Sequence, residues 1–180
     1  IAADTPEATA TMLKRALEHD LVITTGGVSM GRYDFVTDVM KELGIDVMIE
    51  KVLMKPGKPC VFGLKDGVPV FGLPGNPVST MVSFLQFVRP AMLKRMGARV
   101  IDKPRIEAIA AQEIKKKPDR THFLRGFFRI EGNRVMVSTT GPQGSGILRS
   151  MGQANCLIIV PIGVSRVKEG EPVTIQLIHH

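Results

Sequence analysis

Apolar and polar positions in the N-terminal part of the chain follow two interleaved patterns. Spacing of three and four residues predicts helices over 6–18, 35–43 and 78–96. Short continuous or alternating apolar runs predict strands over 21–24, 45–53, 61–64 and 68–73. Helices interleaved with strands indicate an α/β domain, which we place at residues 1–98. Because it opens with a helix and has only about four strands, we expect this fold to be truncated at its N-terminus.

The pattern changes after Gly97, where residues 97–104 show no period and end in proline. We place a linker at 99–104 and a second domain at 105–180. Its apolar runs are short and separated by turn residues, which is typical of a small all-β domain and favours a barrel. Five strands are predicted, over 105–111, 122–130, 134–138, 156–160 and 173–177.

Composition narrows the class of protein. The 180 residues are 44% hydrophobic and 23% charged, an ordinary soluble composition. No apolar run approaches the roughly 20 residues that cross a bilayer, and no signal peptide is visible, so we expect no membrane association. Cys60 and Cys156 lie far apart in apolar runs, which predicts two buried thiols in a reduced cytoplasm rather than a disulfide or a metal pair.

Charge points toward anionic ligands. The formal net charge is +7, but aromatic residues are only 5% and tryptophan is absent, so we expect no nucleic-acid partner. The run Lys115-Lys116-Lys117-Pro118 is interpreted as a solvated hairpin tip. His19 and His122 are isolated in the sequence, and we expect neither to bind a metal.

The stretch 21–34, LVITTGGVSMGRYD, carries the first candidate site. An apolar strand runs into a loop of hydroxyl and glycine residues and then into a helix. Adjacent glycines let the backbone approach a ligand closely, and such loops bind phosphate in α/β proteins. A second strand-to-helix turn, Pro74-Gly75-Asn76-Pro77, is expected at the same edge of the sheet.

Three lysines form a second candidate group. Lys51 lies on the predicted strand 45–53 and Lys55 at its exit turn, and a spacing of four residues in extended chain would place both on one face. Lys58 follows in a turn that Pro56 and Pro59 make rigid. Such cations suit phosphate and other oxyanions, although a solvated face remains the alternative.

Five motifs in register resemble the molybdopterin molybdenumtransferases, the molybdenum cofactor insertion enzymes that include the E domain of gephyrin. They are TTGGVSMGRYDF (24–35), KPGKP (55–59), GLPGNPVS (72–79), FLRGFF (123–128) and TTGPQGSGILRS (139–150). The resemblance covers essentially the whole chain. It implies a three-layer α/β molybdopterin-binding domain followed by a β barrel, with two further N-terminal domains before Ile1.

The resemblance also implies an activity. Members of this family take adenylylated molybdopterin and molybdate, hydrolyse the adenylate in a magnesium-dependent step without ATP, and insert molybdenum into the dithiolene. They are elongated homodimers, and an adenylyltransferase and molybdoenzymes are expected partners. A fragment without the N-terminal domains would hold only part of the site, and whether it is active by itself is not visible in the sequence.

Residue roles in the α/β domain follow from the same resemblance. Asp34 would be a magnesium ligand and a catalytic residue, and Asp4 would assist the metal, although either carboxylate could simply cap a helix. Lys51 and Lys55 would act in catalysis beside the phosphates. The residues expected to bind substrate or molybdate are Thr24, Thr25, Gly26, Gly27, Ser29, Lys58, Pro59, Gly75, Asn76 and Ser79.

In the β domain, the motifs assign Arg125 and Ser145 to the molybdate side of the cleft. An arginine can hydrogen-bond two oxygens of a tetrahedral oxyanion, whereas the alternative is a β-turn with a surface arginine. Arg32 stands where several relatives carry an acidic residue, and its role is open. Whether His179 and His180 belong to a purification tag is also open.

Two other functions fit the sequence less well. A molybdopterin adenylyltransferase shares the glycine-loop fold but normally lacks the β domain. A gephyrin-like scaffold would bind peptides, for which the chain has no signature. The choice between molybdenum and tungsten is not visible in the sequence.

Overall fold

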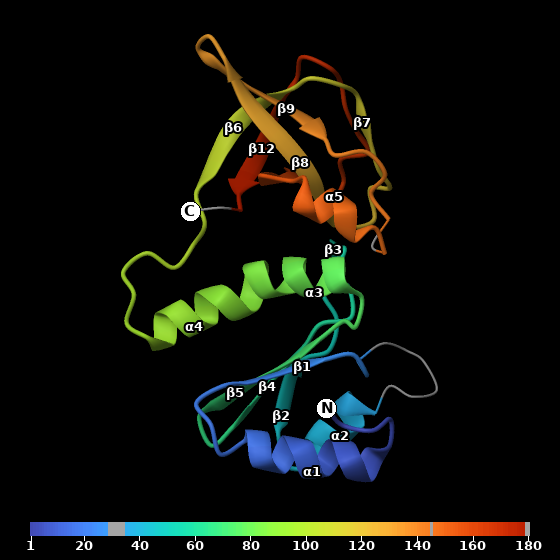
Figure 1. The fold of residues 1–180 in the computed structure, drawn as a ribbon, viewed down its shortest axis with the longest axis vertical. Helices are drawn as coiled ribbons and strands as arrows, with labels where there is room; N and C mark the ends of the chain where they lie inside the picture. Colours follow the sequence, from blue (N-terminus) through green and yellow to red (C-terminus); the bar gives the residue numbers. More distant parts are fainter. Residues whose placement is uncertain (29–34, 145, 179–180) are drawn as a thin grey trace. The chain divides into compact units, whose positions relative to one another are not determined.

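The computed structural model describes residues 1–28, 35–144 and 146–178. The chain divides into two compact units (Figure 1). The first contains Ile1–Val52 and Gly57–Arg99, and the second contains Leu53–Pro56 together with the residues from Val100 onward. Leu53–Pro56 were expected in the α/β domain, so their place in the second unit was not predicted.

The first unit has three layers. Its sheet has the order β1-β5-β4-β2, in which β1 (Val22–Thr25) is parallel to β5 (Val68–Leu73). The remaining neighbours, β4 (Val61–Lys65) and β2 (Asp46–Ile49), are antiparallel to their partners. Helices α1 (Pro6–Ala16) and α2 (Val36–Glu42) cover one face, and the segment from α3 (Pro77–Ser83) to α4 (Arg89–Arg95) covers the other (Figure 1).

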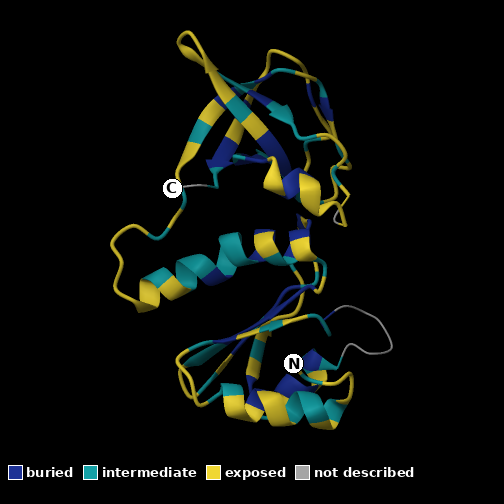
Figure 2. Cartoon of the chain, in the orientation of Figure 1, coloured by how far each residue is buried: buried dark blue, intermediate teal, exposed yellow. Residues whose placement is uncertain are grey.

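Two hydrophobic cores hold these layers together. On one face, Leu13 of α1 and Met40 of α2 pack with Val61 and Val70 of the sheet. On the other face, Phe71 and its neighbours pack against the long helix. Adjacent residues of β5 point to opposite faces, so Val70 and Phe71 enter different cores. Buried strands between partly exposed helices are visible in Figure 2.

Local sequence explains where these elements begin and end. The Thr5 hydroxyl accepts a hydrogen bond from the Ala8 N–H at 3.2 Å and caps α1, whose first position is Pro6. Helix α2 is followed by Gly44 with a φ of 71°. The β4–β5 turn has positive φ at Asp66 and Gly67, which confirms the predicted hairpin.

The long helix predicted over 78–96 is interrupted by a π-helical turn, Phe84–Val88 (η1). Pro90 has no N–H and cannot make the usual bond to the carbonyl of residue 86. The Arg89 N–H reaches back five residues to the Phe84 carbonyl instead. The chain therefore remains helical through the proline by widening one turn.

The second unit is a small barrel. In the described part of the chain, neighbouring strands run in the order β10-β12-β6-β9-β8, and a β8–β10 pairing closes the ring of five. These strands are Cys156–Val160, Pro172–Leu177, Arg105–Ala110, Arg134–Thr139 and Thr121–Glu131, respectively. Ala108, Leu124, Val137, Ile158 and Ile175 fill the interior. The predicted all-β barrel is confirmed.

The predicted strand 45–53 is wrong in its second half. Strand β2 ends at Ile49, and the next strand, β3 (Met54–Lys55), pairs in parallel with the start of β8 in the second unit. Met54, which is buried, lies opposite Thr121, and Lys55 lies opposite His122. Lys51 and Lys55 therefore do not share one strand face, because Lys51 follows β2 and Lys55 lies on β3.

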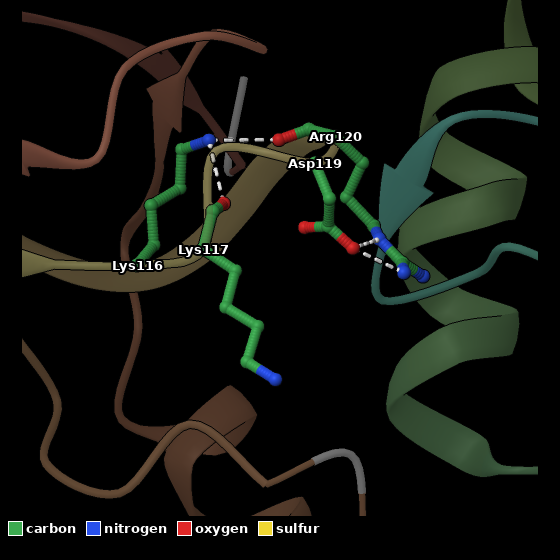
Figure 3. Close-up of polar contacts among 4 residues, drawn as sticks. All are labelled: Lys116, Lys117, Asp119 and Arg120. Carbon is green, nitrogen blue, oxygen red and sulfur yellow. Dashed lines mark hydrogen bonds and ion pairs between the residues drawn. The ribbon is translucent and has the colours of Figure 1, made fainter.

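The lysine run 115–117 is also not a hairpin tip. Lys115 ends a short strand, β7 (Ile114–Lys115), that pairs with β11 (Arg166–Val167). The Lys116 ammonium donates to the backbone carbonyls of Lys117 at 3.2 Å and Arg120 at 2.8 Å (Figure 3). Burial lowers its pKa. Lys116 thus holds the turn before β8, whereas Lys117 is exposed as expected.

Four short elements were not predicted: β3, β7, β11 and helix α5 (Leu148–Gly152). Each has only a few residues, too few for a hydrophobic period to show. Both cysteines are buried free thiols, as predicted, and burial raises the pKa of Cys60 to about 11 and that of Cys156 to about 12. Among the described residues, none of the helices is long and apolar enough to span a membrane.

Candidate functional site

The two glycine turns of the first unit lie against each other. Strands β1 and β5 are parallel and adjacent, with Thr25 opposite Leu73, so the loops that follow them leave the same sheet edge. The Gly26 N–H donates to the Leu73 carbonyl at 2.9 Å. Ligands of open α/β sheets bind beyond this edge of the strands. The sequence prediction that 24–27 and 74–77 come together is therefore confirmed.

Glycine is required at this junction because there is no room for side chains. A Cβ atom on Gly75 would lie 3.3 Å from the Gly26 Cα, and one on Gly72 would lie 2.7 Å from Val28 Cγ1. Gly26 and Gly27 also have positive φ angles of 88° and 70°. The two loops thus meet backbone to backbone, which leaves their polar groups at the edge of the sheet.

Two buried polar atoms at this junction have no hydrogen-bond partner among the described residues: Thr24 Oγ1 and Asn76 Oδ1. Asn76 is the first residue before α3, yet its side chain makes no capping bond. The Thr80 hydroxyl bonds the carbonyls of Pro74 and Asn76 and orders the turn instead. A buried polar group without a partner is costly, so these two atoms are candidates for ligand contact.

A cavity of about 480 Å³ adjoins the first turn. It is lined by Thr24, Thr25, Gly26 and Gly27 and by the N-terminal residues 1–4 that precede α1, including Asp4. Apolar residues of α1 and α2 form much of the remaining wall. Asp4 and the first glycine turn therefore line the same cavity, which is a necessary condition for the expected role of Asp4 beside a phosphate.

The other predicted residues of the first unit take different positions. Ser79 is buried on α3, one turn after Asn76. Lys58 is exposed, and its carbonyl accepts from the N–H groups of Val52 and Cys60, both at 3.0 Å. Pro59 is half-buried, and Lys51 is exposed in the segment after β2.

Arg125 lies on β8 in the second unit and is only 1% exposed. Its guanidinium donates to Ser150 Oγ at 3.0 Å and to the backbone carbonyls of Gln143 at 3.2 Å, Gly144 at 2.9 Å and Pro142 at 3.5 Å. Burial lowers its pKa, but a guanidinium remains charged at neutral pH. Arg125 is therefore no surface arginine: its donors are directed at the loop 142–144.

His122 is a buried histidine that the sequence analysis left without a role. It is 5% exposed, and its Nε2 has no partner among the described residues. Burial, reinforced by the nearby charges of Lys116 and Lys55, lowers its pKa to about 4. Arg125 is three residues further along β8, and strand alternation places it on the opposite face from His122.

Six residues discussed in the sequence analysis lie outside the described part of the chain. They are Ser29, Arg32, Asp34, Ser145, His179 and His180. Among the described residues, no three His, Cys, Asp or Glu side chains gather as a metal site. Asp4 and the unpartnered Thr24 hydroxyl provide oxygen atoms of the kind that magnesium prefers. In donor chemistry these two described residues fit part of a magnesium site, and Asp34, the other carboxylate expected from the sequence, lies outside the described residues.

The hydrogen bonds that join the loop after β9 to Arg125 were not predicted from the sequence. Gln143, Thr140 and Ser150 all bond to Arg125, two of them through its backbone. The only local signal is a glycine-rich segment with polar residues, 139–150, because side-chain bonds to distant backbone groups follow no period.

The first unit is a three-layer α/β domain whose two glycine turns leave the same edge of its sheet, and the second unit is a five-stranded barrel. This combination defines the class of protein. Residues 1–94 match the family model "Probable molybdopterin binding domain" and residues 107–178 match "MoeA C-terminal region (domain IV)". The chain belongs to the molybdopterin-binding domain family, and its order of domains is that of molybdopterin molybdenumtransferases.

Individual relatives agree with this assignment. The molybdopterin molybdenumtransferase of Haemophilus influenzae is 41% identical over 163 residues, 89% of this chain and 40% of that protein. The Staphylococcus aureus protein of the same name is 34% identical over 92% of this chain and 40% of its own length. The solved molybdopterin biosynthesis moea protein from Pyrococcus horikosii has a TM-score of 0.77 at 29% identity, covering 98% of this chain and 42% of that one. The chain thus spans about 40% of the length of these relatives.

Proposed function

We propose that this chain is the part of a molybdenum insertion enzyme, a transferase of molybdenum cofactor biosynthesis, that binds the adenylylated molybdopterin substrate. The observation that carries the proposal is the junction of the two glycine turns, with unpartnered Thr24 Oγ1 and Asn76 Oδ1 beside it. Its relatives are named for transfer of molybdenum to molybdopterin. The whole protein would act in the cytoplasm as a homodimer, with the adenylyltransferase and molybdoenzymes as partners.

Each group would have a defined task. Backbone N–H groups of Gly26 and Gly27 and the Thr24 hydroxyl would contact the phosphates, and Asn76 would hydrogen-bond the substrate. Lys58, in the same unit, would supply positive charge for phosphate and molybdate oxygens. A catalytic role for Lys55 remains a prediction from the sequence. Such a site accelerates the reaction chiefly by positioning and by neutralising charge.

Magnesium would be held by Asp4 and by Asp34, the latter outside the described residues. When bound, it would polarise the phosphoanhydride of the adenylate and favour its hydrolysis. Direct molybdate contacts by Arg125 and Ser145 remain predictions from the sequence. The Arg125 guanidinium is already engaged by loop oxygens, and Ser145 is not among the residues described.

The proposal is tested by Thr24→Val in the full-length protein, with conversion of adenylylated molybdopterin measured at saturating molybdate. Valine keeps the shape of threonine but removes the hydroxyl, and we expect kcat/KM to fall about tenfold or more, equivalent to about 1.4 kcal/mol. Thr174→Val is the matched control, because Thr174 is an exposed strand threonine of the second unit. Equal activity in the two variants would refute the assignment of Thr24.

Assays of the full-length wild-type protein also distinguish the proposed enzyme from a molybdopterin adenylyltransferase. A molybdopterin adenylyltransferase would form adenylylated molybdopterin from ATP, whereas the proposed enzyme would consume it only when molybdate is present. The barrel that matches the MoeA C-terminal region favours the second outcome. Adenylylation by the wild-type protein without molybdate turnover would overturn the proposed function.

A further inference from the structure

A strand of only two residues pairs with the start of β8 in the second unit. This strand, β3, runs parallel to β8, with Met54 opposite Thr121 and Lys55 opposite His122. The Thr121 N–H donates to the Leu53 carbonyl at 3.0 Å. Among the described strands, β3 pairs with β8 alone and therefore lies at the end of its sheet. A short edge segment with few hydrogen bonds opens at lower cost than the body of a domain.

The residue opposite Lys55 is a buried histidine whose ring has an unpartnered nitrogen. His122 is 5% exposed, and its Nε2 has no hydrogen-bond partner among the described residues. On the other edge of β8, its neighbour is the buried apolar residue Val160 of β10. Burial penalises the charged form of the ring, and the described surroundings offer Nε2 no acceptor in return. The closed arrangement therefore favours neutral His122.

The charged groups that act on His122 are mostly cations. Lys55 acts from β3, and Lys116 and Arg120 act from the segment before β8. Asp119 acts in the opposite direction, but its carboxylate is ion-paired with Arg120 (Figure 3). The Lys116 ammonium is held in place by two backbone carbonyls. Burial and these cations together lower the pKa of His122 to about 4.

We propose that the pairing of β3 with β8 is an acid-sensitive latch, which opens when His122 binds a proton. Opposite residues of paired strands share a face, so release of β3 uncovers the ring and removes the Lys55 ammonium from beside it. Closing again requires the proton to leave, and acid therefore increases the open fraction. The opening is local, because β3 pairs with β8 over two residues whereas β10 pairs with β8 over five.

Proton linkage gives the size of the effect. The His122 pKa is about 4 with β3 closed and near the ordinary 6.5 with β3 open. The open form binds more protons between these values, so its population rises as pH falls. The open fraction should increase about twentyfold from pH 7 to pH 5. Above pH 7 the ring is neutral in both forms, and His122 no longer makes the opening depend on pH.

Amide hydrogen exchange of the full-length protein tests the latch at the Thr121 amide, with each rate corrected for the intrinsic effect of pH. We expect the Thr121 protection factor to fall about twentyfold from pH 7 to pH 5. Low urea should hardly change it, because local opening exposes little surface. The control is the Lys116 amide, which donates to the Ser165 carbonyl at 3.0 Å beside another two-residue strand, β7. Its protection should change less than twofold.

The wild-type protein alone can refute the latch. A fall in Thr121 protection of less than threefold would show that the pairing does not respond to acid. Equal protection and equal urea dependence of the Thr121 and Ile158 amides would show that β3 opens only when the barrel unfolds. His122→Leu should abolish the pH dependence at Thr121, and its persistence in that variant would exclude His122 as the group that binds the proton.

Discussion

His122 shows how one residue can make stability depend on pH. Its pKa is lowered to about 4 in the folded chain, chiefly by burial and further by the charges of Lys116 and Lys55. In the unfolded chain an ordinary histidine binds its proton near pH 6.5. Between these values the unfolded state binds more protons than the folded state, so stability falls as pH decreases from about 6.5 toward 4.

We therefore expect the second unit to lose up to roughly 3 kcal/mol of unfolding free energy over that interval because of His122. Urea unfolding of the wild type and of His122→Leu at pH 7 and pH 4.5 measures the effect. The variant should lose distinctly less stability on acidification. His19→Gln, at an exposed position, should behave like the wild type. Parallel pH profiles for the wild type and His122→Leu would contradict the assignment.

At the scale of elements, close contact between strand and loop decides where glycine must stand. Gly72 lies on β5 beneath the first glycine turn, and an added Cβ would lie 2.7 Å from Val28 Cγ1 and 3.2 Å from the Val61 Cβ. Both neighbours are buried and cannot move away freely. Overpacking of this kind typically costs about 1–3 kcal/mol.

Gly72→Ala should thus destabilise the first unit by about that amount, as measured by urea unfolding. It should also weaken binding of the pterin substrate, because Val28 follows the loop that contains Thr24 to Gly27. Gly152→Ala is the control: nothing lies within 4 Å of a Cβ at this position in α5, and alanine suits a helix. Equal unfolding free energies of the two variants would show that the neighbours of Gly72 can move to accommodate a Cβ atom without destabilising the unit.

Some helices, turns and strands could be predicted from neighbouring residues in the sequence, and others could not. The Thr5-Pro6 start of α1 and the Asp66-Gly67 turn follow from capping and turn chemistry alone, and both were predicted. Residues 50–53 were predicted to continue the strand because apolar positions in 45–53 alternate, yet β2 ends at Ile49 and the next strand, β3, pairs with β8 rather than with β4. The alternation of apolar residues within a strand does not show which distant strand it pairs with.

At the scale of the whole molecule, one buried thiol lies in each unit. Cys60 packs with Phe71 and Val88 in the first unit, and Cys156 lies in the barrel core. Burial raises the pKa of both thiols, to about 11 and about 12, so neither supplies much thiolate near neutral pH.

We expect both cysteines to resist iodoacetamide at pH 8 in the native protein and to react when their own unit opens. Peptide mass spectrometry after labelling across a urea series would give two separate labelling curves, one for each unit. The exposed thiols of the fully unfolded chain serve as the control for reagent reactivity. Rapid labelling of either cysteine without urea would contradict its burial.

The amino-acid sequence by itself determined the kinds of elements, the change from α/β to all-β near residue 100, the glycine turns and the family. These depend on period, turn chemistry and motif, which are local properties of the chain. Tertiary structure alone decided that Leu53–Pro56 joins the barrel, that Lys116 and His122 are partly or wholly withdrawn from water, and that Arg125 faces a loop held by Gln143. The reason is physical: burial and long-range hydrogen bonds arise only when residues far apart in sequence come together, and nothing in the local pattern specifies those partners.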